Sequence, residues 1–126
     1  MDNDTYQRAQ ELFEQDDIQG AIALLEGLTR AEPANWRALN RLGALYAHSG
    51  AVEKAIGAFR RAVQVNSRSP KLRYNLGQAC EMAGVPVEAL HQYETALRFD
   101  PQYELARDAC DRLRKHLKQH PAKTEE

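Results

Sequence analysis

Histidines and cysteines are the side chains of this chain that could carry out chemistry. His116 and His120 are spaced i, i+4, so on a helix their imidazoles share one face and could chelate a metal ion. No cysteine or carboxylate is spaced to complete that site, so we interpret the pair as a solvated helix end. Cys80 and Cys110 could form a redox pair, but both fall at apolar positions of helical patterns. We therefore expect them to be small, buried core residues.

Sequence motifs for catalysis are missing. The chain has no GxGxxG, no phosphate-binding loop and no Gly-x-Ser-x-Gly elbow around a nucleophile. The paired acids Asp16-Asp17 stand at a predicted turn, with no pocket expected around them. Nothing in the sequence assembles a nucleophile, a base and an oxyanion site. We therefore expect a protein that is not an enzyme and that has no metal and no cofactor.

Charge and hydropathy narrow the class of partner. The 126 residues include 17 Lys and Arg against 18 Asp and Glu, a net charge of −1, whereas nucleic-acid-binding domains are usually strongly basic. No apolar run approaches the ~20 residues of a membrane helix, and the N-terminus has no secretory pattern. Two cysteines do not make a disulfide framework. We expect a cytoplasmic protein with no nucleic-acid partner and no membrane insertion.

The chain repeats itself with a period of 34 residues. Leu42-Gly43 recurs as Leu76-Gly77, and Gly50 recurs as Gly84. Phe59 aligns with Tyr93 one period later and with Leu25 one period earlier. The three copies cover about 2–35, 36–69 and 70–103. A fixed period of this length is typical of stacked repeat architectures.

The sequence pattern of each copy predicts two helices separated by a turn. In the second copy, an apolar helical stripe over 39–46 ends at Ser49-Gly50, and another follows over 52–63. In the third copy Gly84 is the break, and Pro86 stands at the start of the next helix. In the first copy Gln15-Asp16-Asp17 occupies the turn, where Asp can also cap the next helix.

Small and large residues recur at positions where the predicted helices pack against one another. Gly43 and Gly77 are predicted where two helices approach closely, and Tyr46, Phe59 and Tyr93 are predicted to fill the remaining space. Residues 103–119 predict a last helix with one apolar face and charges elsewhere, typical of a cap with a wet outer side. Pro121 would stop it, and we expect residues 121–126 to be a polar tail.

These residues resemble the tetratricopeptide repeat: Leu42-Gly43 with Tyr46, then Ala55, Phe59 and Ala62, and in the next copy Leu76-Gly77, Ala89, Tyr93, Ala96 and Pro101. The first copy departs from the pattern, with Arg8-Ala9 in place of Leu-Gly, and Cys80 replaces the usual tyrosine. The resemblance covers residues 2–103. It implies an all-α fold, a right-handed superhelical stack of three helix-turn-helix repeats plus a C-terminal capping helix, in one domain over residues 1–120.

The fold implied by this resemblance has a concave groove lined by the first helix of each pair. Amides there can bond an extended peptide backbone, and guanidinium and ammonium groups favour carboxylates. We therefore predict a protein or peptide ligand, acidic or ending in a free carboxylate; a merely solvated face is the alternative. The predicted groove residues are Tyr6, Gln10, Arg37, Asn40, Arg41, His48, Lys71, Tyr74, Asn75 and Gln78.

Some members of this family hold the C-terminal carboxylate of large stress chaperones with a Lys/Asn/Arg constellation. Here Tyr6 and Gln10 stand where the first lysine and asparagine belong, and Arg41 stands where the second asparagine belongs. Asn75 replaces the last arginine, and only Lys71 matches. That specific function is therefore not expected of this chain.

The two ends of the chain differ in charge. Residues 2–17 hold six acids against Arg8, whereas residues 105–123 hold six Lys and Arg against Asp108 and Asp111. Opposite ends of a solenoid with opposite charges could stack head to tail, although charged ends also simply keep a protein soluble.

Three functions remain open from the sequence. The first is an adaptor or scaffold that binds a protein segment in its groove. The second is a self-assembly module that forms oligomers by repeat stacking or helix exchange. The third is an accessory domain of a larger enzyme or complex. Repeat scaffolds share a framework and vary the groove, so the partner itself is not predicted.

Overall fold

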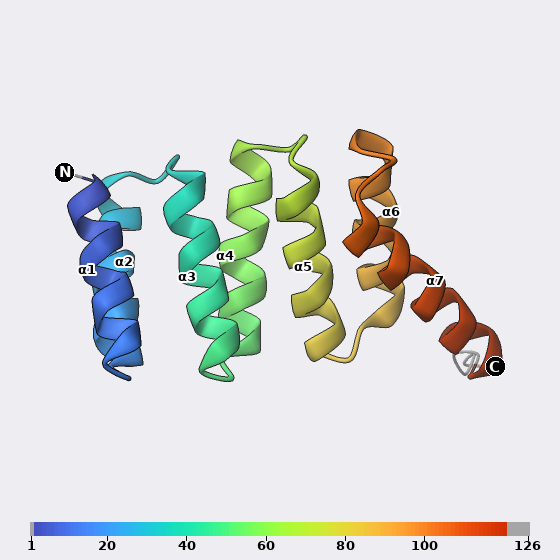
Figure 1. Cartoon of the computed structure of the whole chain (residues 1–126), viewed down its shortest axis with the longest axis horizontal. Helices are drawn as coiled ribbons and strands as arrows, with labels where there is room; N and C mark the ends of the chain where they lie inside the picture. Colours follow the sequence, from blue (N-terminus) through green and yellow to red (C-terminus); the bar gives the residue numbers. More distant parts are fainter. Residues whose placement is uncertain (1, 121–126) are drawn as a thin grey trace. The chain divides into compact units, whose positions relative to one another are not determined.

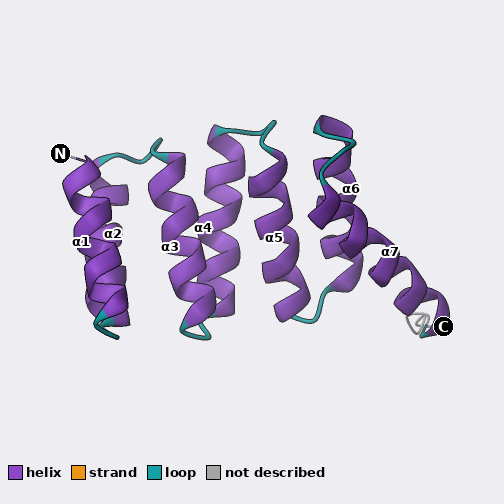
Figure 2. Ribbon diagram, viewed as in Figure 1, coloured by secondary structure: helices purple, strands orange, loops and turns teal. Residues whose placement is uncertain are grey.

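The computed structural model describes residues 2–120, and within them every regular element is an α-helix (Figure 2). The predicted all-α fold is confirmed, and the predicted tail at 121–126 lies outside the described residues. In chain order the helices are α1 (Asp2–Glu14), α2 (Ile18–Ala31), α3 (Trp36–His48), α4 (Val52–Val65), α5 (Pro70–Met82), α6 (Pro86–Phe99) and α7 (Glu104–Gln119) (Figure 1).

The chain divides into two compact units. Unit 1, residues 1–67, holds α1 to α4, in which α1 packs on α2, α2 on α3 and α3 on α4. Unit 2, residues 68–126, holds α5 to α7, in which α5 packs on α6 and α6 on α7. Each unit is therefore built from antiparallel helical hairpins, as the three predicted helix pairs and the final helix require.

The turn inside each hairpin has the same backbone conformation in all three copies. Gly50 and Gly84 have φ of +85° and +78°, and Asp16 has φ of 64° at the matching position. A left-handed residue at this point ends one helix and redirects the chain into the next. Asp is one of the few other residues that accept this conformation, which explains how the first copy forms its turn without glycine.

Helix starts are also set locally. Asp17 accepts a hydrogen bond from the Gly20 amide at 2.9 Å and caps α2, as the sequence indicated. Asn35 and Ser69, one period apart, cap α3 and α5 in the same way, and Tyr103 at the next period makes no side-chain cap. These side-chain oxygens satisfy amides that have no partner within the helix.

Glycine permits close contact between the two helices of the second and third hairpins. A Cβ atom added at Gly43 would lie 2.7 Å from the Phe59 ring, and one added at Gly77 would lie 2.6 Å from the Tyr93 ring. Both rings are buried, which confirms the predicted pairing of small and large residues. In the first hairpin the matching positions are Ala9 and Leu25, where a smaller partner leaves room for a methyl group.

The second and third copies use tyrosine differently. The Tyr46 hydroxyl on α3 donates to the Glu26 carboxylate on α2, and burial together with this carboxylate raises the pKa of Tyr46 to about 12. Cys80, which replaces this tyrosine in the third copy, is fully buried, and so is Cys110 on α7. Both cysteines are therefore core residues, as predicted.

Helix α7 is joined to the rest of unit 2 by charged side chains. Arg112 binds both oxygens of Glu81 on α5, at 2.8 and 2.7 Å, and Arg114 binds Glu94 on α6 at 2.8 Å. Asp111 occupies the position of Gly43 and Gly77 one period on, and it is exposed. Because a charged residue replaces the glycine, α7 has no space against which a further aromatic ring could pack. This suits the predicted role of α7 as a cap.

Candidate functional site

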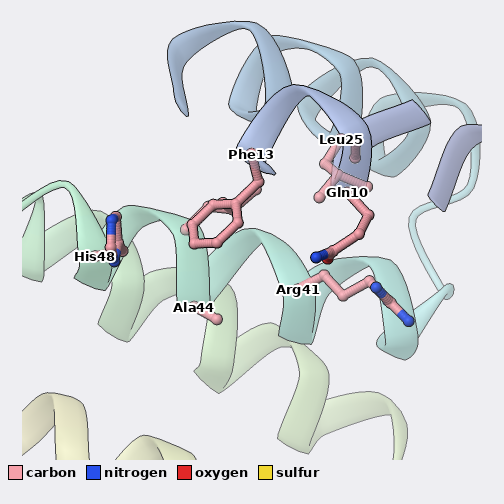
Figure 3. A pocket seen from close by; sticks show the side chains of 8 residues that line it. Gln10, Phe13, Leu25, Arg41, Ala44 and His48 are labelled. Carbon is pink, nitrogen blue, oxygen red and sulfur yellow. The ribbon is translucent and has the colours of Figure 1, made fainter. Parts of the chain in front are cut away.

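A pocket of about 330 Å³ opens between α1 and α3 in unit 1. Three of the predicted groove residues, Gln10, Arg41 and His48, line it. Figure 3 shows Gln10 and Phe13 extending from α1 toward Arg41 and Ala44 on α3. The remaining lining residues are apolar: Ala9, Leu25 and Leu45. The pocket therefore combines an apolar interior with polar and cationic groups around it, the usual composition of a ligand site.

A chain of contacts positions the cation at this pocket. Asn35, which caps α3, also accepts a hydrogen bond from the Tyr6 hydroxyl at 2.9 Å and donates to Glu32 at 3.1 Å. The Tyr6 ring in turn lies against the Arg41 guanidinium, whose carbon is 4.9 Å from the ring centroid. Tyr6 is therefore half-buried and fixed by the cap, so that its ring holds Arg41 beside the pocket by a cation–π contact.

Arg37 is held in a similar way one helical turn earlier on α3. Its guanidinium carbon lies 4.6 Å from the centroid of the Trp36 ring. Among the side chains of residues 4–120, no carboxylate forms an ion pair with Arg37 or Arg41. Two guanidinium groups on one helix are thus stacked on aromatic rings while their hydrogen-bonding edges remain available to an anionic ligand.

His48 closes the other end of the pocket. Its imidazole meets the Phe13 ring edge to face, with centroids 5.1 Å apart. Phe13 was not among the predicted site residues. Its signal in the sequence is a break in the repeat, because the positions one and two periods later are Ala47 and Glu81. A large aromatic residue where the other copies have none indicates a local role rather than a framework role.

Glu11 and Glu14 of α1 are engaged along their own helix. Gln10 donates to Glu14 at 3.2 Å, and Gln7 donates to Glu11 at 3.4 Å. Arg8 forms an ion pair with Glu11 at 3.7 Å. Gln10 therefore uses one amide hydrogen in a bond within its own helix, and its carbonyl oxygen and second amide hydrogen can bond a ligand in the pocket.

The other predicted groove residues have mixed environments. Asn40 on α3 and Asn75 on α5 are half-buried, and Lys71 on α5 is exposed. Gln78 is also exposed and donates to the Tyr74 hydroxyl at 3.1 Å. The Tyr74 ring lies 5.5 Å from Tyr93 and 5.8 Å from Tyr103, in an aromatic cluster inside unit 2. The Tyr74 ring therefore packs within unit 2, in addition to its predicted place in the groove. Six of the ten predicted residues belong to unit 1 and four to unit 2.

Large pKa shifts are found in unit 2, away from the pocket between α1 and α3. Tyr93 is fully buried and donates its hydroxyl to Glu81 at 2.6 Å. Burial and the Glu81 charge raise the pKa of Tyr93 far above its usual range. The bidentate contact from Arg112, helped by the Tyr93 hydrogen bond, lowers the pKa of Glu81 against the opposing effect of burial. This Tyr93–Glu81–Arg112 network is explained by structure alone, because it ties α6, α5 and α7 together.

The remaining histidines make no metal centre in the described part of the chain. His116 and His120 are exposed, with ring centroids 4.9 Å apart, which agrees with a solvated helix end. Within residues 4–120 there is no group of three or more histidines, cysteines or acids that could hold a metal ion. None of the described helices is both long and apolar enough to span a membrane.

Comparison with known proteins identifies the fold. The family model of the tetratricopeptide repeat matches residues 6–69 and 55–104. The chain belongs to the tetratricopeptide repeat family. Its helices thus form an all-α repeat stack of the kind that this family builds, as the resemblance implied.

Solved tetratricopeptide repeat domains share this fold at low sequence identity. The Sgt2 domain of Aspergillus fumigatus is 19% identical with a TM-score of 0.84, over 98% of this chain and 87% of that one. The first such domain of Spaghetti (RPAP3), solved with the HSP90 peptide SRMEEVD, is 20% identical with a TM-score of 0.83, over 90% of each chain.

A curated relative is longer than this chain. The peroxisomal targeting signal receptor of Saccharomyces cerevisiae is 35% identical over 77 residues, which are 61% of this chain. The match spans only 13% of the receptor.

Proposed function

We propose that this tetratricopeptide repeat protein is a non-catalytic interaction adaptor, and that the pocket between α1 and α3 binds a segment of a partner protein. The observation that carries the proposal is the pairing of an apolar pocket of about 330 Å³ with stacked guanidinium groups that no carboxylate of the described chain neutralises. The Spaghetti (RPAP3) domain, solved with an acidic peptide bound, supports a peptide ligand for this fold.

The geometry favours a particular kind of peptide. An apolar side chain of the ligand enters between Phe13 and Leu45, since this space is lined by carbon atoms. A carboxylate close to it in the ligand, from an acidic side chain or the chain terminus, pairs with Arg41, which can offer two parallel N–H groups. Gln10 and Asn40 bond the peptide backbone. In unit 2, Lys71, Asn75 and Gln78 on α5 are polar groups of the same kinds.

A binding experiment with two site variants tests the proposal. A displayed library of random heptapeptides is selected against the protein, and the enriched peptides are then measured individually by calorimetry. We expect enrichment of an apolar residue together with Asp, Glu or a free C-terminus. Arg41→Glu should weaken these peptides at least about tenfold, or 1.4 kcal/mol. Ala44→Trp should weaken them similarly, because the indole fills the pocket without changing charge.

A matched control separates the site from general charge effects. Lys54→Glu makes the same change of charge on α4, in the first turn, where an acid suits the helix dipole. This variant should bind the selected peptides as the parent does. If peptides are enriched without any acidic or apolar preference, or if Arg41→Glu and Ala44→Trp bind as well as the control, another surface carries the function.

A further inference from the structure

Arg37 has no role in the proposed function, because it does not line the pocket between α1 and α3. It is nevertheless spaced i, i+4 from Arg41, so the two side chains are neighbours on the surface of α3. Both side chains are exposed. The Arg37 guanidinium is held on the Trp36 ring, and the Arg41 guanidinium is held on the Tyr6 ring. Two positive charges are therefore held close together at the surface.

This placement of Arg37 is unfavourable for the helix alone. Arg37 is the second residue of α3, where a positive charge opposes the helix dipole, and the first turn of α3 contains no acid. Like charges at i, i+4 also repel each other. Neither arginine forms an ion pair with another side chain of residues 4–120, and Glu32, just before α3, bonds to Asn35 instead. Local conflicts of this kind are typical of residues that serve a ligand.

The repeat framework does not require the arginine pair. One period later the two positions hold Lys71 and Asn75, and one period earlier they hold Asn3 and Gln7. Two guanidinium groups at these positions thus occur only in the copy whose first helix, α3, lines the pocket. The pair is therefore a feature of this site and not of the stacked fold.

The spacing of the arginines determines which acidic segment fits them. Four residues advance about 6 Å along an α-helix. In an extended chain, the side chains of alternate residues point to the same side and lie about 6.6 Å apart. Two acids separated by one residue therefore match Arg37 and Arg41, and each guanidinium can hold one carboxylate in its own fork. Adjacent acids of an extended chain point to opposite sides and do not fit in this way.

The pocket continues the same pattern along α3. Ala44 and His48, which line the pocket, follow Arg41 by about one and two helical turns. Figure 3 shows Arg41 extending away from His48, which is the last residue of α3. An apolar ligand residue two places from the acid at Arg41 therefore lies over the pocket. The extended conformation is favoured because its backbone groups are free to bond Gln10, whereas a helix bonds its own.

We infer that the ligand of this site is an extended segment with the pattern acid-x-acid-x-apolar, in which Arg37 and Arg41 each hold one carboxylate. The inference rests on the proposed function and adds Arg37 as a residue that determines specificity. A phosphorylated side chain would also supply two negative charges. Two carboxylates suit the site better, because each guanidinium is held on a ring of its own. Both arginines are exposed, so binding weakens as salt screens the charges.

Synthetic heptapeptides with blocked ends test this inference by calorimetry at about 50 mM salt. The alternating peptide is Ser-Ser-Glu-Ser-Glu-Ser-Leu. Its comparisons carry adjacent acids (Ser-Ser-Ser-Glu-Glu-Ser-Leu), acids at helical spacing (Glu-Ser-Ser-Ser-Glu-Ser-Leu) or one acid (Ser-Ser-Ser-Ser-Glu-Ser-Leu). A further peptide has phosphoserine in place of that single acid, and each peptide is made in both chain directions. In the direction that binds, the alternating peptide should bind at least about threefold more tightly than every other peptide.

Three variants locate the second carboxylate. Arg37→Gln should lower the affinity for the alternating peptide to that for the single-acid peptide, whose own binding should stay nearly unchanged. Arg41→Gln should weaken both of these peptides. Arg61→Gln is the matched control, because it removes the same charge from the exposed face of α4, and it should bind every peptide as the parent does.

The outcomes separate this inference from the proposed function. Equal binding of the alternating, adjacent and helically spaced peptides would overturn the inference, and so would Arg37→Gln weakening the single-acid peptide as much as the alternating one. Tighter binding of the phosphoserine peptide would replace the two carboxylates with one phosphate. In these cases the proposed function stands, provided that binding still depends on Arg41. If no peptide binds, or if Arg41→Gln and Ala44→Trp leave binding intact, the proposed function fails together with the inference.

Discussion

Replacing Gly43 with alanine is expected to destabilise unit 1, although alanine is the better helix former. A Cβ at this position would lie 2.7 Å from the nearest atom of the Phe59 ring, and ordinary contact begins near 3.4 Å. The ring would have to retreat by about 0.7 Å in a close-packed interior. Phe59 is only 4% exposed, so it has no free space to enter.

The magnitude follows from two opposing effects. Forcing extra volume into a packed core costs about 1–3 kcal/mol. Replacing glycine with alanine inside a helix stabilises the helix by about 0.5–1 kcal/mol. We therefore expect Gly43→Ala to lower the free energy of unfolding by roughly 1–2 kcal/mol, and Gly77→Ala to do so in unit 2, where Tyr93 is the confined ring.

The chain supplies its own controls. Gly27 and Gly57 are also inside helices of unit 1, and a Cβ at either meets nothing within 4 Å. Gly27→Ala and Gly57→Ala should therefore stabilise the protein by about 0.5–1 kcal/mol each. Urea unfolding followed by circular dichroism, with the fluorescence of Trp36 as a probe within unit 1, measures all these variants.

A double variant tests the mechanism. Gly43→Ala combined with Phe59→Leu recreates the Ala9–Leu25 pair of the first hairpin, in which both side chains are buried together. The two changes should be coupled by about 1–2 kcal/mol, so that the pair costs less than the sum of its parts. If Gly43→Ala stabilises the protein as Gly57→Ala does, or if the double variant shows no coupling, confinement of the ring is not the reason for the glycine.

Three further predictions concern other positions. Tyr93→Phe should cost about 1–2 kcal/mol in urea unfolding, because it removes a buried hydrogen bond to a charged carboxylate. The pKa of Glu81 is held below its usual 4.5, so its stabilising contribution is present above that pH and lost as pH falls below it. The free energy of unfolding, measured at pH values above and below 4.5, should therefore vary less with pH in Glu81→Gln than in the parent. Equal slopes against pH in the two proteins would contradict this role of Glu81. Asp16→Gly should raise the free energy of unfolding by about 0.5–1 kcal/mol and Gly50→Ala should lower it similarly, since both residues have positive φ; opposite signs in thermal melts would exclude this explanation.

Local signals made the helices predictable. The stripes, the glycine at the second and third turns and the capping residues act within a few residues of one another, so their effect does not depend on distant parts of the chain. The expected final helix over 103–119 is α7, Glu104–Gln119, preceded by Tyr103. The predicted burial of Cys80 and Cys110 followed from the same helical spacing.

The candidate site was predictable only in part. The pattern indicated which helix faces carry polar side chains, and three of the residues it predicted for the groove, Gln10, Arg41 and His48, line one pocket in the structure. It did not indicate Phe13, whose ring packs on a histidine 35 positions away, or the stacking of Arg41 on Tyr6. It also treated Tyr74 as a groove residue only, whereas its ring belongs to an aromatic cluster.

The sequence by itself determined the repeat, the helices and the close approach at Gly43 and Gly77, because these depend on periodic burial and on local backbone preferences. The tertiary structure decided which side chains meet across helices. Arg112 reaches Glu81 over 31 positions of sequence, and Tyr6 reaches Asn35 over 29. Such contacts depend on distances in space that a spacing along the chain does not encode, and the contact of Tyr6 with Asn35 helps to hold Arg41 beside the pocket.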